Sequence, residues 1–255
     1  MVGAVAPGWD PVWLVLAGFT AGLVGSIAGL ASLISYPALL ALGLSPVTAN
    51  VSNTVALVFS SVGSIWGSGP ELAGQRTRAW HLVPIAVVGG IVGGVLLLET
   101  SSTGFALAVP WLIGLASLGI LIRRKPGRPP PVDGALPSWK LGGGVFLIGV
   151  YSGYFGAAAG VLLLALLLVT TVESLPRCNA LKNLLAGLAN GVAAVIFVAF
   201  ASVRWMAVLP LAVGFLGGGR LGPVIVRRVP ARPLRALIAL AGLGLAIHLG
   251  LDAYG

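Results

Sequence analysis

Three amide side chains recur at helical spacing in one apolar segment of the sequence. Asn179, Asn183 and Asn190 stand at intervals of four and seven residues, so they share one face of an α-helix. An amide inside an apolar helix is stabilised when it is hydrogen-bonded, either to a ligand or to a neighbouring helix. The stripe therefore predicts a lining that binds a small oxyanion or, alternatively, a set of hydrogen bonds that joins two helices.

A second polar stripe, in the first half of the chain, matches this one. Asn50 and Asn53 lie three residues apart, and Ser60 follows at the position that corresponds to Asn190. We expect the two stripes to face each other. Lys182 lies within the later stripe, and its ammonium group either attracts an anionic substrate or extends to the cytoplasmic edge of the membrane.

The composition indicates what kind of helices must hold these stripes. Of the 255 residues, 58% are hydrophobic and 8% are charged, whereas a soluble domain averages about 25% charged residues. Apolar runs near the ~20 residues that cross hydrocarbon recur along the chain. We therefore predict an all-α polytopic membrane protein in a lipid bilayer. The net charge of +9 indicates basic cytoplasmic loops rather than a nucleic-acid partner.

The pattern of segments occurs twice along the chain. The hydrophilic, Pro-rich stretch 123–140 separates residues 1–122 from residues 141–255. The string "GLVGSIAGLAS" in the first part resembles "GVYSGYFGAAAG" in the second, and "LIGLASLGI" resembles "LIALAGLGL" in the same order. Ordered matches of this kind predict two repeats in one integral membrane domain, joined by a cytoplasmic linker.

The basic residues predict that the two repeats are inverted. Loop 99–103 contains no Lys or Arg, whereas its counterpart 220–235 contains five arginines. Because basic residues gather on the cytoplasmic side, these equivalent loops lie on opposite sides of the membrane. With stretch 123–140 in the cytoplasm, both termini are expected outside. Each repeat is then expected to contain one helix hairpin followed by three transmembrane helices.

Small residues interrupt each expected hairpin, at 25–32 ("GSIAGLAS") and 153–160 ("GYFGAAAG"). The second arms, 33–44 and 161–172, are roughly 18 Å long as helices and fall short of the ~30 Å hydrocarbon core. We therefore favour broken, re-entrant hairpins over two thin full spans. Each second arm would point free N–H groups and a positive dipole end into the protein, where an anion binds; alternatively, the glycines only allow close packing. The candidate residues in these breaks are Gly25, Gly29, Ser32, Gly153, Gly156 and Gly160.

Motifs for other chemistry are absent from the sequence. It contains no HExxH, GxSxG or Walker motif, and the single Cys178 excludes an internal disulfide and a cysteine-based metal cluster. We therefore expect no enzymatic activity, no cofactor and no metal. The apolar segments carry almost no Asp or Glu, and because a cation transporter usually needs buried carboxylates, this favours an anionic substrate.

These segments resemble the TauE/SafE family of sulfite exporters. The resemblance rests on "AGLVGSIAGLASLISYPALLALGLSPVTANVSNTVA" and on "GVYSGYFGAAAGVLLLALLL" with "NALKNLLAGLAN". It implies a bacterial-type inner membrane and transport of sulfite, a sulfonate, sulfoacetate or a related organic anion. We expect a secondary transporter that works by alternating access, with an uncoupled anion channel or an assembly subunit as the alternatives. A coupling proton or ion and a homodimer are left open.

Overall fold

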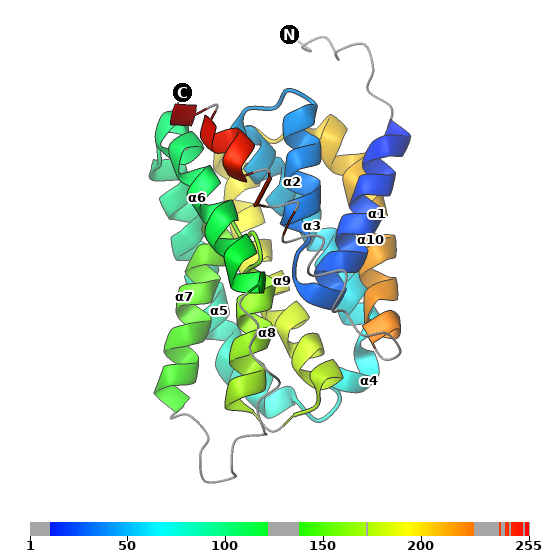
Figure 1. Cartoon of the computed structure of the whole chain (residues 1–255). Coiled ribbons are helices and arrows are strands. Elements are labelled where there is room, and N and C mark those ends of the chain that lie inside the picture. Colours follow the sequence, from blue (N-terminus) through cyan, green and yellow to red (C-terminus); the bar gives the residue numbers. More distant parts are fainter. Residues whose placement is uncertain are drawn as a thin grey trace.

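The structure, a computed structural model, describes residues 11–121, 138–171 and 173–226, together with 240, 243–244, 246–251 and 253–254. Regular structure within these ranges is entirely helical (Figure 1), as the composition predicted. The predicted linker 123–140 and the predicted loop 220–235 lie largely outside the described residues. The helices are α1 (Pro11–Ala28), α2 (Ser32–Ala41), α3 (Pro46–Gly67), α4 (Gly69–Leu72), α5 (Arg76–Glu99), α6 (Ser102–Leu121), α7 (Ser138–Tyr154), α8 (Ala159–Thr170), α9 (Leu175–Phe200) and α10 (Trp205–Val226).

Four of the described helices are long and apolar enough to cross a membrane, namely α1, α5, α9 and α10. Helix α3 has 22 residues but is not among the four, because its asparagine, serine and threonine residues lower its hydropathy. The most polar long helix is thus one that the sequence predicted to carry a functional stripe.

Two helix hairpins turn back inside the molecule. Helix α1 ends at Ala28 and α2 begins at Ser32, while α7 ends at Tyr154 and α8 begins at Ala159. Figure 1 shows α2 returning to the end where α1 begins, and α8 returning to the opposite end, where α7 begins. At 10 and 12 residues, α2 and α8 are about 15 and 18 Å long. The predicted second arms are therefore short, as expected.

The turns depend on glycine. Gly29 and Gly156 adopt φ values of 78° and 74°, a left-handed conformation in which a side chain is strained. These two residues are equivalent in the predicted repeat. Gly25 and Gly153, which the sequence placed in the breaks, instead lie inside α1 and α7. The two glycines remain helical because each hairpin reverses direction within only a few non-helical residues, after Ala28 and after Tyr154.

The two breaks contact each other through their backbones. A Cβ atom built on Gly160 would lie 2.6 Å from the Cα atom of Gly29, a separation that real Cβ atoms do not show. The neighbouring Leu30, Ala157 and Ala158 are almost completely buried. The point of contact is therefore in the interior of the protein, where a side chain on either glycine would force the breaks apart.

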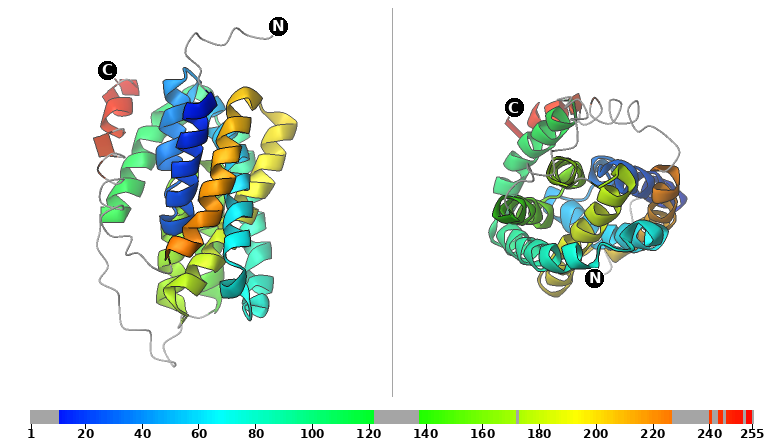
Figure 2. Two further views of the ribbon diagram at one scale, coloured as in Figure 1. Left: turned by 90° about the vertical axis from the view of Figure 1, so that its right-hand side faces the viewer. Right: turned by 90° about the horizontal axis from the view of Figure 1, so that it is seen from below.

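The first helix of each half of the chain packs against a later helix of the other half. The first helix, α1, lies beside α10 (Figure 2), and α7 packs against α5. Glycines make both contacts close: Gly18 abuts the backbone of Leu211, and Gly93 abuts the backbone of Val150. Small residues at such crossings let helices associate in lipid, where water does not drive their packing.

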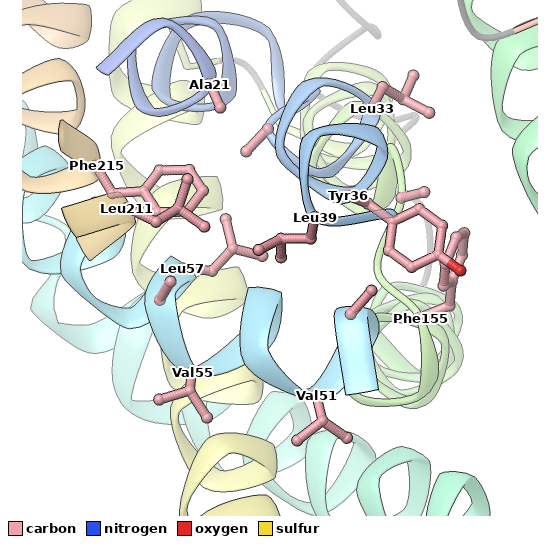
Figure 3. Packing of buried hydrophobic residues seen from close by; sticks show 14 of the residues in the cluster. Ala21, Leu33, Tyr36, Leu39, Val51, Val55, Leu57, Phe155, Leu211 and Phe215 are labelled. Atoms are coloured by element: carbon pink, nitrogen blue, oxygen red, sulfur yellow. The ribbon is translucent and has the colours of Figure 1, made fainter. Parts of the chain in front are cut away.

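A layer of aromatic residues covers the second break. The ring of Tyr36 in α2 meets Phe155 edge-on at 5.3 Å, and Phe105 of α6 lies 5.8 Å from Phe155. Figure 3 shows Tyr36 and Phe155 next to each other, with Leu39 beside Tyr36. All of these side chains are buried. This side of the break is therefore packed with apolar groups.

Candidate functional site

A cavity of about 60 Å³ lies where the two breaks meet. That volume is several times the ~10–15 Å³ needed to hold one water molecule. Its walls come from both hairpins and from the middle of α3 and α9. The lining residues are Gly25, Ser26, Gly29, Ala31, Ser32, Leu57, Ser60, Ser61, Ser64, Ser152, Gly156, Ala159, Gly160, Lys182, Asn183, Ala186 and Asn190.

Most of the residues that the sequence singled out line this cavity. Those that do are Gly25, Gly29, Ser32, Ser60, Gly156, Gly160, Lys182, Asn183 and Asn190. Asn50, Asn53, Gly153 and Asn179 are not part of the lining. The structure thus brings together residues from both halves of the chain at the cavity. Asn50 and Asn53 of the first stripe and Asn179 of the second lie outside its lining.

Lys182 is the one basic residue among the lining residues, and it is buried, with 1% of its surface exposed. Its Nζ donates hydrogen bonds to the carbonyl oxygens of Gly25 and Ser26, at 3.2 Å each. These carbonyls belong to the last turn of α1, where the helix dipole is negative and a cation is stabilised. Lys182 therefore does not extend to the membrane edge, the alternative considered from the sequence.

Two asparagines reinforce the same helix end. The amide Nδ2 atoms of Asn179 and Asn183 donate to the carbonyl oxygen of Ser26, at 2.9 and 3.4 Å. A helix that ends inside an apolar environment leaves carbonyls without intrahelical partners, and these need donors from elsewhere. Helix α9 supplies those donors to α1.

Asn50 supplies a hydrogen-bond donor to the helix end of the other hairpin, the end of α7. Its Nδ2 donates to the carbonyl oxygen of Tyr154, the last residue of α7, at 2.9 Å. Asn53 instead joins α3 to α2, since its Nδ2 donates to Ser32 Oγ at 3.1 Å and its Oδ1 accepts from Ser35 Oγ at 2.5 Å. These contacts match the alternative interpretation of the stripes, in which amides join neighbouring helices.

The far side of the cavity is also tied together by polar groups. Ser152 Oγ of α7 donates to Asn190 Oδ1 of α9 at 2.9 Å. Both residues line the cavity, so this bond fixes the wall that they share.

Positive helix ends face the cavity from two directions. Ser32 begins α2 and lies in the lining, as do Ala159 and Gly160 at the start of α8. Some first-turn N–H groups already donate to carbonyls of the breaks, as Ile34 does to Ala31 and Val161 does to Ala158. The positive dipole ends of α2 and α8 still face the cavity, together with the negative end of α1. No Asp or Glu is among the described residues that line the cavity.

Four serines of the lining were not identified from the sequence. Ser61 and Ser64 extend the predicted position Ser60 along the same part of α3, and Ser26 and Ser152 lie just before the two breaks. The run of serines at 60, 61 and 64 was the available signal. Serine is also common at tightly packed helix crossings, so its presence alone did not distinguish residues that line a cavity from residues that only pack helices together.

The fold defines the class of protein: a multi-pass helical membrane protein with a cavity between its helices. Residues 14–249 match the family described as sulfite exporter TauE/SafE. The match covers most of the chain, and the chain belongs to this family.

Relatives in several bacteria are named as transporters. The chain is 26% identical to the probable membrane transporter protein YfcA of Escherichia coli (strain K12), over 92% of this chain and 87% of the relative. It is 24% identical to the probable membrane transporter protein ORF9 of Sinorhizobium sp, over 94% and 92% of the two chains. No solved structure matches. Family and relatives together make the chain a membrane transporter.

Proposed function

We propose that the chain is a secondary transporter of a small oxyanion, and that the anion binds in the cavity where the two breaks meet. The observation that carries this proposal is the lining itself. It combines the ammonium of Lys182, the first turns of α2 and α8, and serine hydroxyls, with no carboxylate among its described residues.

Each component suits a small anion that must bind and leave. A buried ammonium and two helix ends attract negative charge, and they act strongly because water is largely excluded. Part of the ammonium's hydrogen-bonding capacity is already directed to Gly25 and Ser26, which moderates the attraction. The hydroxyls of Ser60, Ser61 and Ser64 add donors without adding charge. The family is described as sulfite exporters, so sulfite is the first candidate, followed by sulfonates and sulfoacetate.

Inverted repeats and re-entrant hairpins belong to the same proposal. In their support, Gly29 and Gly156 share the same unusual backbone conformation at equivalent positions. The exchanged packing of α1 on α10 and of α7 on α5 is what a two-fold relation between the repeats would produce. The short α2 and α8 favour hairpins that stop within the bilayer.

Alternating access then follows as movement of the two halves around the central cavity, as in other transporters built from inverted repeats. The orientation follows from charge. Arg76, Arg177, Arg220 and Lys140 lie at the end where α5, α7 and α9 begin and α10 ends, the lower end in Figure 1. We assign that end to the cytoplasmic side of an inner membrane, since basic residues gather there.

Anion binding and flux by the purified chain test this proposal. We expect sulfite to raise the unfolding temperature of the protein in detergent. We expect Lys182→Gln, which keeps a hydrogen-bond donor but removes the charge, to weaken sulfite binding about 10–100-fold, because a hydrogen bond to a charged group contributes about 1.5–3 kcal/mol. The matched control is Lys140→Gln, which removes a lysine charge at the start of α7, away from the cavity.

Flux measurements separate the carrier from the alternatives. In liposomes we expect sulfite uptake that saturates and that accelerates when sulfite is present on the opposite side. Conductance far above carrier rates would identify a channel instead. Absence of both flux and binding, for sulfite, sulfate, taurine, sulfoacetate and carboxylates alike, would exclude the proposed function.

A further inference from the structure

One carboxylate at the lower end of the molecule is shared by two arginines. Arg78 Nη1 donates to Glu173 Oε1 at 3.2 Å, and Arg177 Nε donates to Glu173 Oε2 at 2.6 Å. Each of the three side chains is between a quarter and a third exposed. Two guanidinium groups that converge on one carboxylate have the chemistry of a site for an oxyanion, since arginine forms paired hydrogen bonds with such groups.

The residues around this cluster join the two halves of the chain. Arg177 Nη1 also donates to the carbonyl oxygen of Ala73 at 3.2 Å, and Gln75 Nε2 donates to the carbonyl oxygen of Arg177 at 3.0 Å. The segment that leads into α5 is thereby tied to the segment that leads into α9. If Arg177 exchanged Glu173 for another partner, the distance between the two halves at this end could therefore change.

The cluster is close to the central cavity along a single helix. Arg177 precedes Lys182 by five residues of α9, which is roughly 7.5 Å along the helix axis. Five residues correspond to a rotation of about 140° around the helix, so the two side chains leave α9 in different directions, and the rise gives only their relative height along the axis.

At the opposite end of the molecule, the position equivalent to Glu173 carries no carboxylate. Arg204, just before α10, is the repeat counterpart of Arg78, since each precedes a helical proline by six residues, Pro210 and Pro84. The repeat counterpart of Glu173 is Gly43, and a side chain there would project into open space. Both ion pairs found within the described ranges involve Glu173. Arg204 Nε is buried and has no hydrogen-bond partner in that part of the chain.

We propose that Arg78 and Arg177 form a second anion site, at the cytoplasmic mouth, and that Glu173 occupies it in this structure as an internal substitute for the transported anion. A transported anion displaces the Glu173 carboxylate as it passes. Displacement breaks the bridge between Arg78 and Arg177 and frees the lower end to open. The inference rests on the proposed function, in which the cargo is an anion.

The asymmetry between the two ends argues against a purely structural bridge. If the start of α5 needed the ion pair for packing, the start of α10 would be expected to need one too. Instead, the arginine is present at both equivalent positions, Arg78 and Arg204, whereas the carboxylate of Glu173 is replaced by Gly43. Glu173 therefore competes with an anion for Arg78, and the equivalent position near Arg204 supplies no such competitor.

Titration of the purified protein with sulfite at constant ionic strength tests the second site. We expect the wild type to bind one sulfite, at the site that Lys182→Gln weakens. We expect Glu173→Gln, which preserves the shape of the side chain but not its charge, to bind a second sulfite at least tenfold more tightly than any second binding to the wild type. Adding Arg78→Gln should remove that second site, whereas adding Arg76→Gln, an exposed arginine of the same end, should change its affinity by less than threefold.

The outcomes distinguish this inference from the proposed function. A single Lys182-dependent sulfite in Glu173→Gln would overturn the second site and leave the central site intact. No sulfite bound to either protein would remove the basis of both. If Glu173→Gln is too unstable to titrate, Glu173→Ala offers a second measurement, in which added acetate should raise the unfolding temperature by binding between the arginines, and adding Arg78→Gln should abolish that rise. No rise with acetate, or a rise that persists with Arg78→Gln, would equally overturn the inference.

Discussion

At the scale of single residues, one backbone oxygen organises much of the site. The carbonyl of Ser26 accepts hydrogen bonds from Asn179, Lys182 and Asn183, all from α9. These side chains supply hydrogen-bond donors to the end of α1. Lys182 and Asn183 also line the cavity, so the groups that end the helix form part of its wall.

The hydrogen bond from Asn50 to the end of α7 can be tested by substitution. We expect Asn50→Ala to lower the free energy of unfolding by about 1 kcal/mol, the usual scale for a hydrogen bond between membrane helices, because it leaves the Tyr154 carbonyl without its donor. Thermal unfolding in detergent measures the change. Thr54→Val is the control, since the Thr54 hydroxyl bonds only the carbonyl of Asn50 within its own helix; an equal loss in both variants would show that the contact with α7 is unimportant.

Spacing along the sequence predicted which helix faces are polar but not what each amide bonds. The four-residue interval between Asn179 and Asn183 predicted that both share one face of α9 opposite the stripe of α3, whereas both donate to the end of α1. Their acceptor, Ser26, is more than 150 residues away in the chain, and no local pattern identifies it. Asn53 shows the same limit, because its partners depend on how α2 folds back over α3.

At the scale of the elements, the breaks are the most constrained part of the fold. The Gly-rich segments predicted interruptions, and the structure has them at Gly29 and Gly156. The sequence did not predict that Ala158 also adopts a left-handed conformation, with φ 58°. Alanine does not favour this conformation. Ala158 lies directly before α8 and is buried, and its conformation is not evident from a run of small residues.

Substitution of the break glycines tests this contact. We expect Gly160→Ala to lower the free energy of unfolding by about 1–3 kcal/mol, because the added methyl group overlaps the backbone of Gly29. Gly191→Ala is the matched control in α9: nothing lies within 4 Å of the added atom, and alanine favours a helix over glycine by about 1 kcal/mol. Equal stability of the two variants in a thermal unfolding assay would contradict the close contact.

At the scale of the whole molecule, the surface fits a protein surrounded by lipid. Trp13 and Trp205 are exposed near the starts of α1 and α10, and Trp66, Trp80 and Trp139 are exposed near the lower end. Exposed tryptophans near the ends of transmembrane helices are typical of the two membrane interfaces. Around Trp66, the guanidinium of Arg220 stacks on the ring at 3.8 Å, a contact suited to the headgroup region.

The proposed orientation is tested by cysteine accessibility in intact cells. We expect Ser101→Cys, in the connection between α5 and α6, to react with a membrane-impermeant maleimide added from outside. Gly69→Cys, an exposed position at the lower end, should react only after the cells are opened. Cys178 is buried and should contribute little background. Labelling of both positions from the same side would contradict the proposed arrangement of the repeats.

The contact between Gly29 and Gly160 has a further consequence, for how the two halves evolve. Gly29 and Gly160 are not repeat counterparts: when Gly29 is aligned with Gly156, the counterpart of Gly160 is Leu33. If the halves arose by duplication, position 160 is restricted to glycine by a residue of the other copy, whereas position 33 is free to carry a large side chain. Such a contact prevents position 160 from acquiring the leucine of its counterpart. At the place where the halves meet, an exchange of residues between the two copies is therefore tolerated in one direction only.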